Sequence, residues 1–594
     1  MSPSFDSPGI GLPQDARTLA HQTGIVTEQS QPAGRPPGAF GARWAGGLLA
    51  LALVWFGLLG VRGLFAPDEG RYGLIPREML ASGDWVTPHL NALVYFEKPP
   101  LQYWLTAGFY ALFGEHEWTV RLWPALTGFA TLALVGCFAA LRRGPAAAAI
   151  AVSVLASSLL FFFFSQVTTL DMGLTFFLTA GMFGLTLAAG DAERSARWAA
   201  FAWLALALAV LSKGLVALVL PGLTVIVYAA LARDLSIVRR AHPLLGAVIV
   251  AFVAGPWMAL AQIEHPQFFQ FFFIHEHFAR YSTTVHHRTG AWWYFLAVVA
   301  FGAMPWTALA AGIFRRSLLR RPPAGQINEA GLLALWVAIV VLFYSASDSK
   351  LPAYVLPVFP PLALLTAGAI CDTPPARAAR CAWPAALLGI ALAAAAFVLV
   401  ARDVDDVPAG MAAGYLPWIG AAALLLVAGA IAAAKLFASA RPAPAAVVLG
   451  AAALLAWQLA LTGSTSFEQA YSGREFARTV IAGLGPHGSE GEWYSVGTFD
   501  NSFAFYVKHP LIVVAYEDEL KFGLDLDPRR GIPAMEDFVR QWTSARQSFA
   551  MMQPKVYQGL LERGVPMVLV ARDLRRVFVA RVPLNMPAPA VLPR

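Results

Sequence analysis

Charged residues are scarce in this chain of 594 residues, since Asp, Glu, Lys and Arg together make up only 13% of it. A water-soluble protein usually carries about 25% charged residues, so the deficit excludes an ordinary soluble domain. Hydrophobic residues make up 58% of the chain and the mean hydropathy is +0.58. The solvent of most of the chain is therefore lipid.

Cysteine is also scarce. The three cysteines, Cys137, Cys371 and Cys381, lie in or beside apolar segments, and their spacing excludes a disulfide framework and a cysteine-based metal site. A cleavable signal pattern is missing too, because a polar tail rich in Pro, Gly and Gln precedes an apolar run that begins late and is long enough to span. We expect residues 1–43 to be a disordered cytoplasmic tail.

Long apolar runs, by contrast, are abundant. A bilayer core about 30 Å thick needs roughly 20 apolar residues per helix. Thirteen segments qualify: 44–64, 119–140, 146–164, 172–190, 197–212, 214–232, 242–263, 291–314, 328–346, 352–371, 382–401, 414–437 and 443–463. The sequence therefore predicts an all-α polytopic membrane protein with about thirteen transmembrane helices over residues 44–463.

The basic residues test that count independently. The net charge of +7 could suggest a nucleic-acid partner, but the basic residues form short clusters between apolar runs, and they fall in every second loop. This alternation follows the positive-inside rule. The positive charge is therefore explained by membrane topology, and we reject a nucleic-acid partner. The alternation places the N-terminus in the cytoplasm and residues 464–594 outside, where strand-like runs such as 493–499, 511–516 and 566–571 alternate with helical stretches near 475–484 and 534–563. We expect these residues to form an external α/β domain.

The external loops carry the unusual residues. The loop 65–118 opens with Asp68, Glu69 and Arg71 after Pro67. Two acids after a proline suit the positive end of a helix dipole, and a carboxylate at the membrane boundary can also act as a base or bind a cation. Both interpretations stay open here, and we place Glu69 and Arg71 in the substrate pocket.

Further candidates follow along the chain. Lys98, held by the two prolines after Tyr95-Phe96-Glu97-Lys98, is a natural phosphate partner. Asp171, in the third loop, is a helix cap or a functional acid. Lys213 lies between two predicted spans and either snorkels or binds an anion.

The seventh loop, 264–290, is rich in His and Phe. His275 and His277 are two residues apart, so a helix points them to different faces, and a metal site needs a partner such as Glu97 from another loop. Arg280 is a candidate phosphate ligand.

The ninth loop carries Asp348 and Lys350, which either pair with each other or face the site. Tyr354, in a proline-rich segment predicted to bend the following helix, faces either the site or lipid. We assign Lys350 and Tyr354 to the substrate pocket.

The stretch APDEGRYGLIPREMLASGDWVTPHLNALVYFEKPPLQYWL closely resembles the first external loop of the bacterial aminoarabinose transferases. These are lipid A-modifying relatives of the protein O-mannosyltransferases, within the GT-C class of membrane glycosyltransferases. The resemblance continues through TTLDMG, LSKG, HEHFARY and SDSKLPAYVLP and covers roughly residues 45–371. It implies a polyprenyl-phosphate sugar donor and a soluble external C-terminal domain.

The resemblance also implies roles for individual residues. Asp68 and Asp171 match catalytic acids, while Lys98, Lys213 and Arg280 match the residues that hold the donor phosphate. Glu97 and His275 match positions that can bind a structural zinc ion, although the chemistry requires no cofactor. Tyr354 matches a tyrosine lining the donor site.

The expected function is transfer of 4-amino-4-deoxy-L-arabinose from undecaprenyl phosphate to lipid A by a monomer in the bacterial inner membrane. The alternatives are a related transferase for another sugar, such as hexosamine or mannose, or for a protein hydroxyl, and, more remotely, a transporter. A transporter is disfavoured because the polar residues gather on one face and no pair of broken helices repeats in the two halves.

Overall fold

The computed structural model describes residues 37–279, 290–313, 321–323, 325–401, 409–485, 491–544, 547–582 and 590–591. The chain divides into two units, Met1–Leu53 and Val54–Arg594. Helix α2 (Pro37–Phe56) crosses the division. Apart from α2, all elements described below belong to the second unit.

The described residues form an apolar helical bundle of the kind that crosses membranes. By length and composition, seven of their helices could span a bilayer, or up to ten if each of three bent pairs counts as one span. The long apolar helices are α5 (Glu117–Arg143), α8 (Asp171–Gly190), α9 (Ser195–Lys213), α18 (Phe359–Asp372) with the preceding 3₁₀ turn η4 (Pro352–Val358), α20 (Trp383–Ala401) with α19 (Pro375–Cys381), α21 (Ala409–Ala438) and α22 (Pro442–Gly463). Shorter apolar helices are Gly46–Phe56 within α2, α10 (Val216–Ala232) and α17 (Glu329–Ser345).

Each predicted span coincides with one of these helices or with a bent pair, so the multi-pass helical class is confirmed and the count of thirteen stays a prediction. The bent pairs differ from the straight helices that we expected. They are α6 (Pro145–Ser157) with α7 (Leu159–Gln166), bent by 64°; α12 (Pro243–Val253) with α13 (Gly255–Glu264), bent by 44°; and α15 (Tyr294–Gly302) with Thr307–Ile313, bent by 115°.

Local chemistry explains two of these breaks. Pro305 interrupts the third pair because proline lacks the amide hydrogen that a continuing helix needs. At the first break, the carbonyl of Ser157 accepts a 2.8 Å hydrogen bond from the Trp457 indole, and its hydroxyl accepts one of 2.9 Å from Trp306. Inside a membrane a broken helix is tolerated only where such partners satisfy the freed backbone groups.

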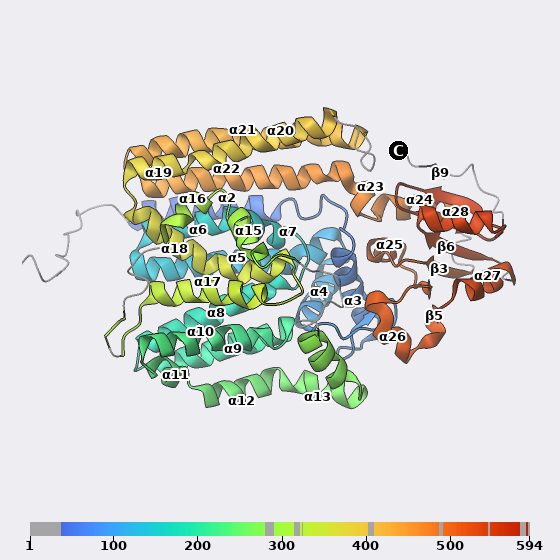
Figure 1. Ribbon diagram of the computed structural model, residues 1–594, viewed down its shortest axis with the longest axis horizontal. Helices are drawn as coiled ribbons and strands as arrows, with labels where there is room; N and C mark the ends of the chain where they lie inside the picture. The colour runs from blue at the N-terminus through green and yellow to red at the C-terminus, as the bar shows by residue number, and fades with distance from the viewer. Residues whose placement is uncertain are drawn as a thin grey trace, which may run out of the picture. The chain divides into compact units, whose positions relative to one another are not determined.

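Neighbouring helices run side by side in the bundle. Helix α8 packs on α5 and α9, and α22 packs on α6 and α21 (Figure 1). Helices α8 and α9, which are neighbours in the sequence, pair closely. Gly181 and Gly184 have no side chain, so α8 can approach Leu206 and Ala202 of α9, and an added Cβ at either glycine would clash with them. The bundle thus brings the end of α9 at Lys213 beside the start of α8 at Asp171.

The first external loop forms a compact structure of its own. It contains α3 (Asp68–Ser82), a hairpin of β1 (His89–Leu90) and β2 (Leu93–Val94), and α4 (Leu101–Phe113).

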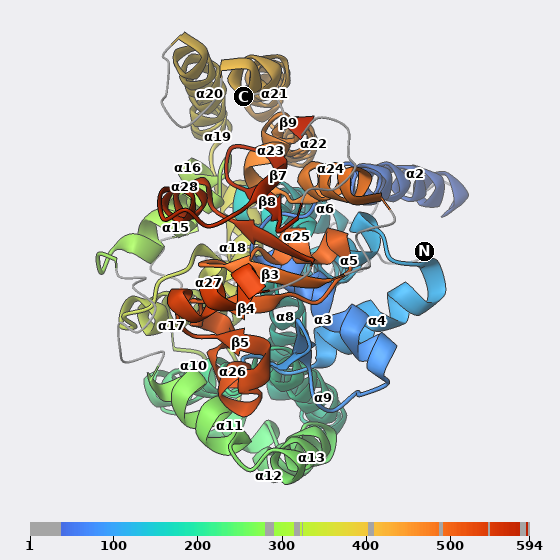
Figure 2. The ribbon, with the colours of Figure 1, turned by 90° about the vertical axis from the view of Figure 1, so that its right-hand side faces the viewer.

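The C-terminal segment (residues 464–594) carries a sheet with strand order β5-β4-β3-β6-β8-β7-β9, which Figure 2 shows from its outer side. Strand β3 pairs in parallel with β4 and β6, while β8 is antiparallel to β6 and β7. The strands are β3 (Glu492–Val496), β4 (Ile512–Val514), β5 (Gly531–Ile532), β6 (Ser548–Met552), β7 (Val568–Arg572), β8 (Val577–Ala580) and β9 (Ala590–Val591). The helices include α24 (Arg474–Leu484), α25 (Asn501–Val507), α26 (Lys521–Leu526), α27 (Met535–Ser544) and α28 (Pro554–Glu562).

One expectation for this segment was wrong. The stretch 534–563, predicted to be helical, contains α27 and α28 with the strand β6 between them. Every residue of β6 is buried, so its sequence SFAMM lacks the polar alternation that marks a half-exposed strand. Pairing with β3 and β8 decides its conformation.

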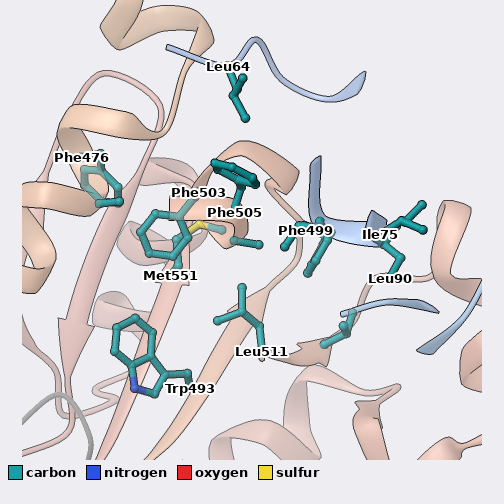
Figure 3. Packing of buried hydrophobic residues seen from close by; sticks show 14 of the residues in the cluster. Leu64, Ile75, Leu90, Phe476, Trp493, Phe499, Phe503, Phe505, Leu511 and Met551 are labelled. Atoms are coloured by element: carbon teal, nitrogen blue, oxygen red, sulfur yellow. The ribbon is translucent and has the colours of Figure 1, made fainter. Parts of the chain in front are cut away.

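An apolar cluster joins the first external loop to the C-terminal segment. Ile75 and Leu90 come from the loop and Leu64 immediately precedes it, while Phe499, Phe503 and other aromatic residues come from the C-terminal segment (Figure 3). Helix α25 packs on α3, and an added Cβ at Gly70 of α3 would lie 2.5 Å from the Asn501 backbone carbon. The C-terminal segment therefore fixes the helix that begins at Asp68.

Candidate functional site

Helix α3 presents its first two acids to different surroundings. Asp68 is the first residue of the helix, its side chain is 48% exposed, and its Oδ1 lies 3.4 Å from Arg71 Nη1. Glu69 has no exposed surface and forms a bidentate pair with Arg121, with both N–O distances 2.7 Å. Of these two acids, therefore, Asp68 is the one that a substrate can contact.

The structure gives Glu69 a different place from the substrate pocket that we expected. Its carboxylate also accepts the backbone amides of Phe65 and Thr168. The Arg121 guanidinium also donates hydrogen bonds to the carbonyls of Leu59, Arg62 and Gly63. Burial alone would raise the pKa of the Glu69 carboxyl, but the Arg121 guanidinium lowers it below its usual range. The pair holds the chain together where α3, α5 and the turn before α8 meet.

Arg71 lies between two carboxylates. Its side chain is 11% exposed, Nη1 faces Asp68, and Nη2 lies 3.1 Å from an oxygen of Glu519 in the C-terminal segment. Arg71 Nε is buried and has no hydrogen-bond partner among the described residues. The expected position of Arg71 beside Asp68 is thus present, and Glu519 is an added partner.

Lys98 lies in a second group of acids. Its ammonium donates to Glu276 at 3.0 Å and lies 3.8 Å from the Glu97 carboxylate. Glu276 belongs to the π-helix η1 (Gln270–Ala279), where His275 Nδ1 lies 3.4 Å from its other oxygen. The loop 65–118 and the loop 264–290 therefore meet at Lys98.

Asp171 and Lys213 form a third group. Their side chains make a salt bridge, and the Lys213 ammonium lies 4.9 Å from the centre of the Tyr354 ring. Asp171 begins α8 and Lys213 ends α9, so each charge complements a helix dipole. No side chain caps α8, so a cap role for Asp171 is not what the structure shows. Gly214, at φ +84, allows the sharp exit that follows Lys213.

The charges of these groups also act on the Tyr72 hydroxyl. Burial raises the pKa of its hydroxyl, and the charges of Asp68, Glu97 and Asp171 raise it further while Arg71 opposes them. The ring of Tyr72 stacks on Tyr103 at 6.2 Å between centroids. Charges from the loop 65–118 and from Asp171 at the start of α8 therefore act on the same hydroxyl.

The structure gives Lys350 contacts at the end of a helix. The Lys350 ammonium donates to the carbonyls of Ser345 and Ser347 at 3.1 and 2.9 Å, at the end of α17. This is the favourable position for a cation at a helix C-terminus, and the assignment of Lys350 to the substrate pocket stays a prediction. Arg280 lies outside the described residues.

The described residues do not form a metal site around Glu97 and His275. Among them no group of three or more His, Cys, Asp or Glu side chains is arranged to hold an ion. The Lys98 ammonium already lies between the Glu97 and Glu276 carboxylates. The structural zinc ion stays a prediction that elemental analysis of the purified protein tests.

Sequence reasoning missed Arg121, Glu276, Glu519 and Tyr72. Arg121 had a usable signal, since it is an isolated arginine just inside the predicted span 119–140. Glu276 stands within the quoted HEH motif but was passed over for its two histidines. Nothing in the sequence connects Glu519 with Arg71, which precedes it by several hundred residues.

Two family models match parts of this chain. Residues 47–273 match the model of the dolichyl-phosphate-mannose-protein mannosyltransferases. Residues 485–581 match that of the aminoarabinose transferase C-terminal domain.

Individual relatives extend the match. An undecaprenyl phosphate-alpha-4-amino-4-deoxy-L-arabinose arabinosyl transferase of Pseudomonas fluorescens is 33% identical over 346 residues, which cover 56% of this chain and 60% of the relative. One from Aeromonas salmonicida is 33% identical over 335 residues, covering 56% of this chain and 60% of that relative. The alignments thus span about three fifths of these curated relatives.

A solved structure covers more. The crystal structure of ArnT from Cupriavidus metallidurans bound to undecaprenyl phosphate is 33% identical to this chain and superposes with a TM-score of 0.83. The superposition covers 91% of this chain and 98% of that one. The chain therefore belongs to the ArnT family of membrane glycosyltransferases.

Proposed function

We propose that this protein transfers 4-amino-4-deoxy-L-arabinose from undecaprenyl phosphate to a phosphate of lipid A, at the external face of the bacterial inner membrane. The observations that carry the proposal are ion pairs between charged residues of separate segments. Arg71 pairs with Asp68 and with Glu519, Lys98 with Glu276, and Lys213 with Asp171. This chain's ArnT relative was crystallised with undecaprenyl phosphate, and curated relatives are named for this transfer.

The charges of the site suit a donor that carries charge of both signs. In the three charged groups of the candidate site, the described carboxylates outnumber the described basic residues. The carboxylates are Asp68, Glu97, Asp171, Glu276 and Glu519, and the basic residues are Arg71, Lys98 and Lys213. A phosphodiester anion can take the lysines as partners, and the ammonium of an amino sugar can take a carboxylate. A neutral hexose can donate hydroxyl hydrogen bonds to the extra acids but offers them no positive charge.

The reaction needs charge stabilisation more than proton transfer. The bond between the anomeric carbon and the phosphate oxygen breaks, its electron pair stays on the lipid phosphate, and an acceptor oxygen bonds to the anomeric carbon. Lys98 and Lys213 stabilise the negative charge that develops on the departing phosphate.

The acceptor decides the role of Asp68. A lipid A phosphate is already ionised near neutral pH and needs no strong base, so Asp68 holds the sugar ammonium or orients the acceptor. For a hydroxyl acceptor Asp68 would have to be the general base.

We also infer thirteen spans, a cytoplasmic N-terminus and an external C-terminal α/β domain. The support is that every predicted span meets a helix or bent pair and that basic loops alternate along the sequence. We expect the protein to act as a monomer and to give resistance to cationic antimicrobial peptides such as polymyxin.

In the direct test, the purified protein is incubated with lipid A and with labelled undecaprenyl-phosphate aminoarabinose. The expected product is lipid A heavier by one amino-pentose in a mass spectrum. A hexosamine or hexose addition in cells, with none of the amino-pentose, would favour the related transferase. Movement of substrate without a covalent product would favour a transporter.

A further inference from the structure

We infer that Glu519 is a positioning residue for the transfer reaction, acting on the site through Arg71. The inference rests on the proposed function. It gives the C-terminal segment a direct part in the chemistry, because Glu519 lies in that segment while Arg71 and Asp68 lie in the first external loop.

The contacts form a relay of alternating charge. Glu519 lies 3.1 Å from Arg71 Nη2, and Arg71 Nη1 lies 3.4 Å from Asp68 Oδ1. The side chains of Arg71 and Glu519 are each 11% exposed, whereas Asp68 is 48% exposed. The two inner members are thus shielded from water, and the outer member is the more accessible carboxylate.

Glu519 is itself held firmly. Asn501 Nδ2 donates to its carboxylate at 2.8 Å, and Asn501 is 1% exposed. The next residue, Leu520, is buried in the cluster that joins loop and C-terminal segment. Because α25 also touches α3 at Gly70, the distance between Glu519 and Arg71 is fixed by the packing of two backbones.

The shared guanidinium is the reason that the charge of Glu519 matters. With two carboxylates beside it, Arg71 neutralises neither completely, and Asp68 keeps negative charge for the substrate. If Glu519 were neutral, Arg71 would pair with Asp68 alone and hold it away from the sugar ammonium or acceptor. Fewer bound substrates would then reach the reactive arrangement, so turnover would fall more than donor binding.

The decisive variant is Glu519→Gln in the full-length protein. Glutamine keeps the size and can still accept from Asn501, so a merely structural role predicts wild-type activity. We expect kcat to fall by roughly 10-fold or more, the size of a lost charge-assisted hydrogen bond, with donor KM within about twofold. Glu519→Asp keeps the charge and should retain more activity than Glu519→Gln, which serves as the rescue.

The matched control is Glu517→Gln, two residues away. Glu517 is 59% exposed and lies 3.6 Å from Lys521 rather than near Arg71, so its kcat should equal that of the wild type. A second control is the double variant with Arg71→Met, in which the effect of Glu519→Gln should disappear because the relay is already broken.

The outcomes separate the two claims. If the wild type transfers aminoarabinose and Glu519→Gln matches it, the relay is refuted and the proposed function stands. Independent, multiplying losses in the double variant would refute the relay as well, as would an equal loss in Glu517→Gln. Absence of transfer by the wild type would refute the function itself.

Discussion

Asp68 and Glu69 are neighbours in the chain with opposite environments. Successive helical residues point about 100° apart, so Asp68 faces the site while Glu69 faces Arg121 and has no exposed surface. Two adjacent acids that look equivalent in the sequence therefore do different work. One is available to a substrate, and the other holds three segments together.

Replacing the exposed acid tests the catalytic assignment. Asp68→Ala should abolish transfer, because the site loses the carboxylate that holds the sugar ammonium or the acceptor. The protein should still fold, since Asp68 is half exposed and its contact with Arg71 is long, at 3.4 Å. Lipid A mass spectrometry reads the activity and a thermal melt reads the fold. Wild-type activity in this variant would remove Asp68 from the site.

Replacing the buried acid tests the structural assignment. Glu69→Gln leaves Arg121 as an uncompensated buried charge, which typically costs about 3–5 kcal/mol. The lowered pKa of Glu69 also fixes the pH dependence. Its contribution to stability is present above the ordinary Glu value of about 4.3 and is lost as the pH falls through the lower folded value.

The measurement is the melting temperature in detergent against pH for both proteins. The wild type should approach Glu69→Gln at low pH and exceed it by several degrees near neutral pH. A constant difference across the acid range would contradict the assigned pKa.

At the scale of elements, the contact between α3 and α25 decides where the first external loop sits. The Asn91 side chain adds a clamp, since it donates to the Leu511 carbonyl at 2.7 Å and accepts from the Leu511 amide at 2.8 Å. Arg77 adds another, bridging Glu115 and the Phe505 carbonyl. These contacts bury polar groups only in matched pairs, which makes the position of the loop specific.

Gly70→Ala tests this contact directly. The new methyl would meet the Asn501 and Ser502 backbones at 2.5 Å, and overpacking of this kind costs about 1–3 kcal/mol. Gly108→Ala in α4 is the control, because nothing lies within 4 Å of the added carbon and alanine favours helix by up to about 1 kcal/mol. Thermal melts of both variants should therefore shift in opposite directions, and equal shifts would argue against a tight α3–α25 contact.

At the scale of the whole molecule, the apolar helices and the alternating basic loops determine topology. A cysteine at the exposed position Glu517 should react with a membrane-impermeant reagent in spheroplasts, because the C-terminal segment is expected outside. A cysteine at the exposed position Arg194 should react only after lysis. Both are introduced after replacing Cys137, Cys371 and Cys381. The reverse labelling pattern would overturn the orientation.

The apolar runs and the basic loops are enough to predict which segments lie in lipid. A run of about twenty apolar residues and the positions of the arginines are local properties that need no tertiary contact. The alternating basic loops also predict that acids and cations gather in the loops of one side, among them Asp68, Lys98, Asp171 and Lys213. Only the tertiary structure decided which of those charges are available. Glu69 is paired with Arg121, and Lys350 donates to carbonyls at the end of α17. Arg71 contacts Glu519 as well as Asp68. Pairing depends on distances between segments far apart in the chain, and the same is true of β6, whose buried residues became a strand through its neighbours.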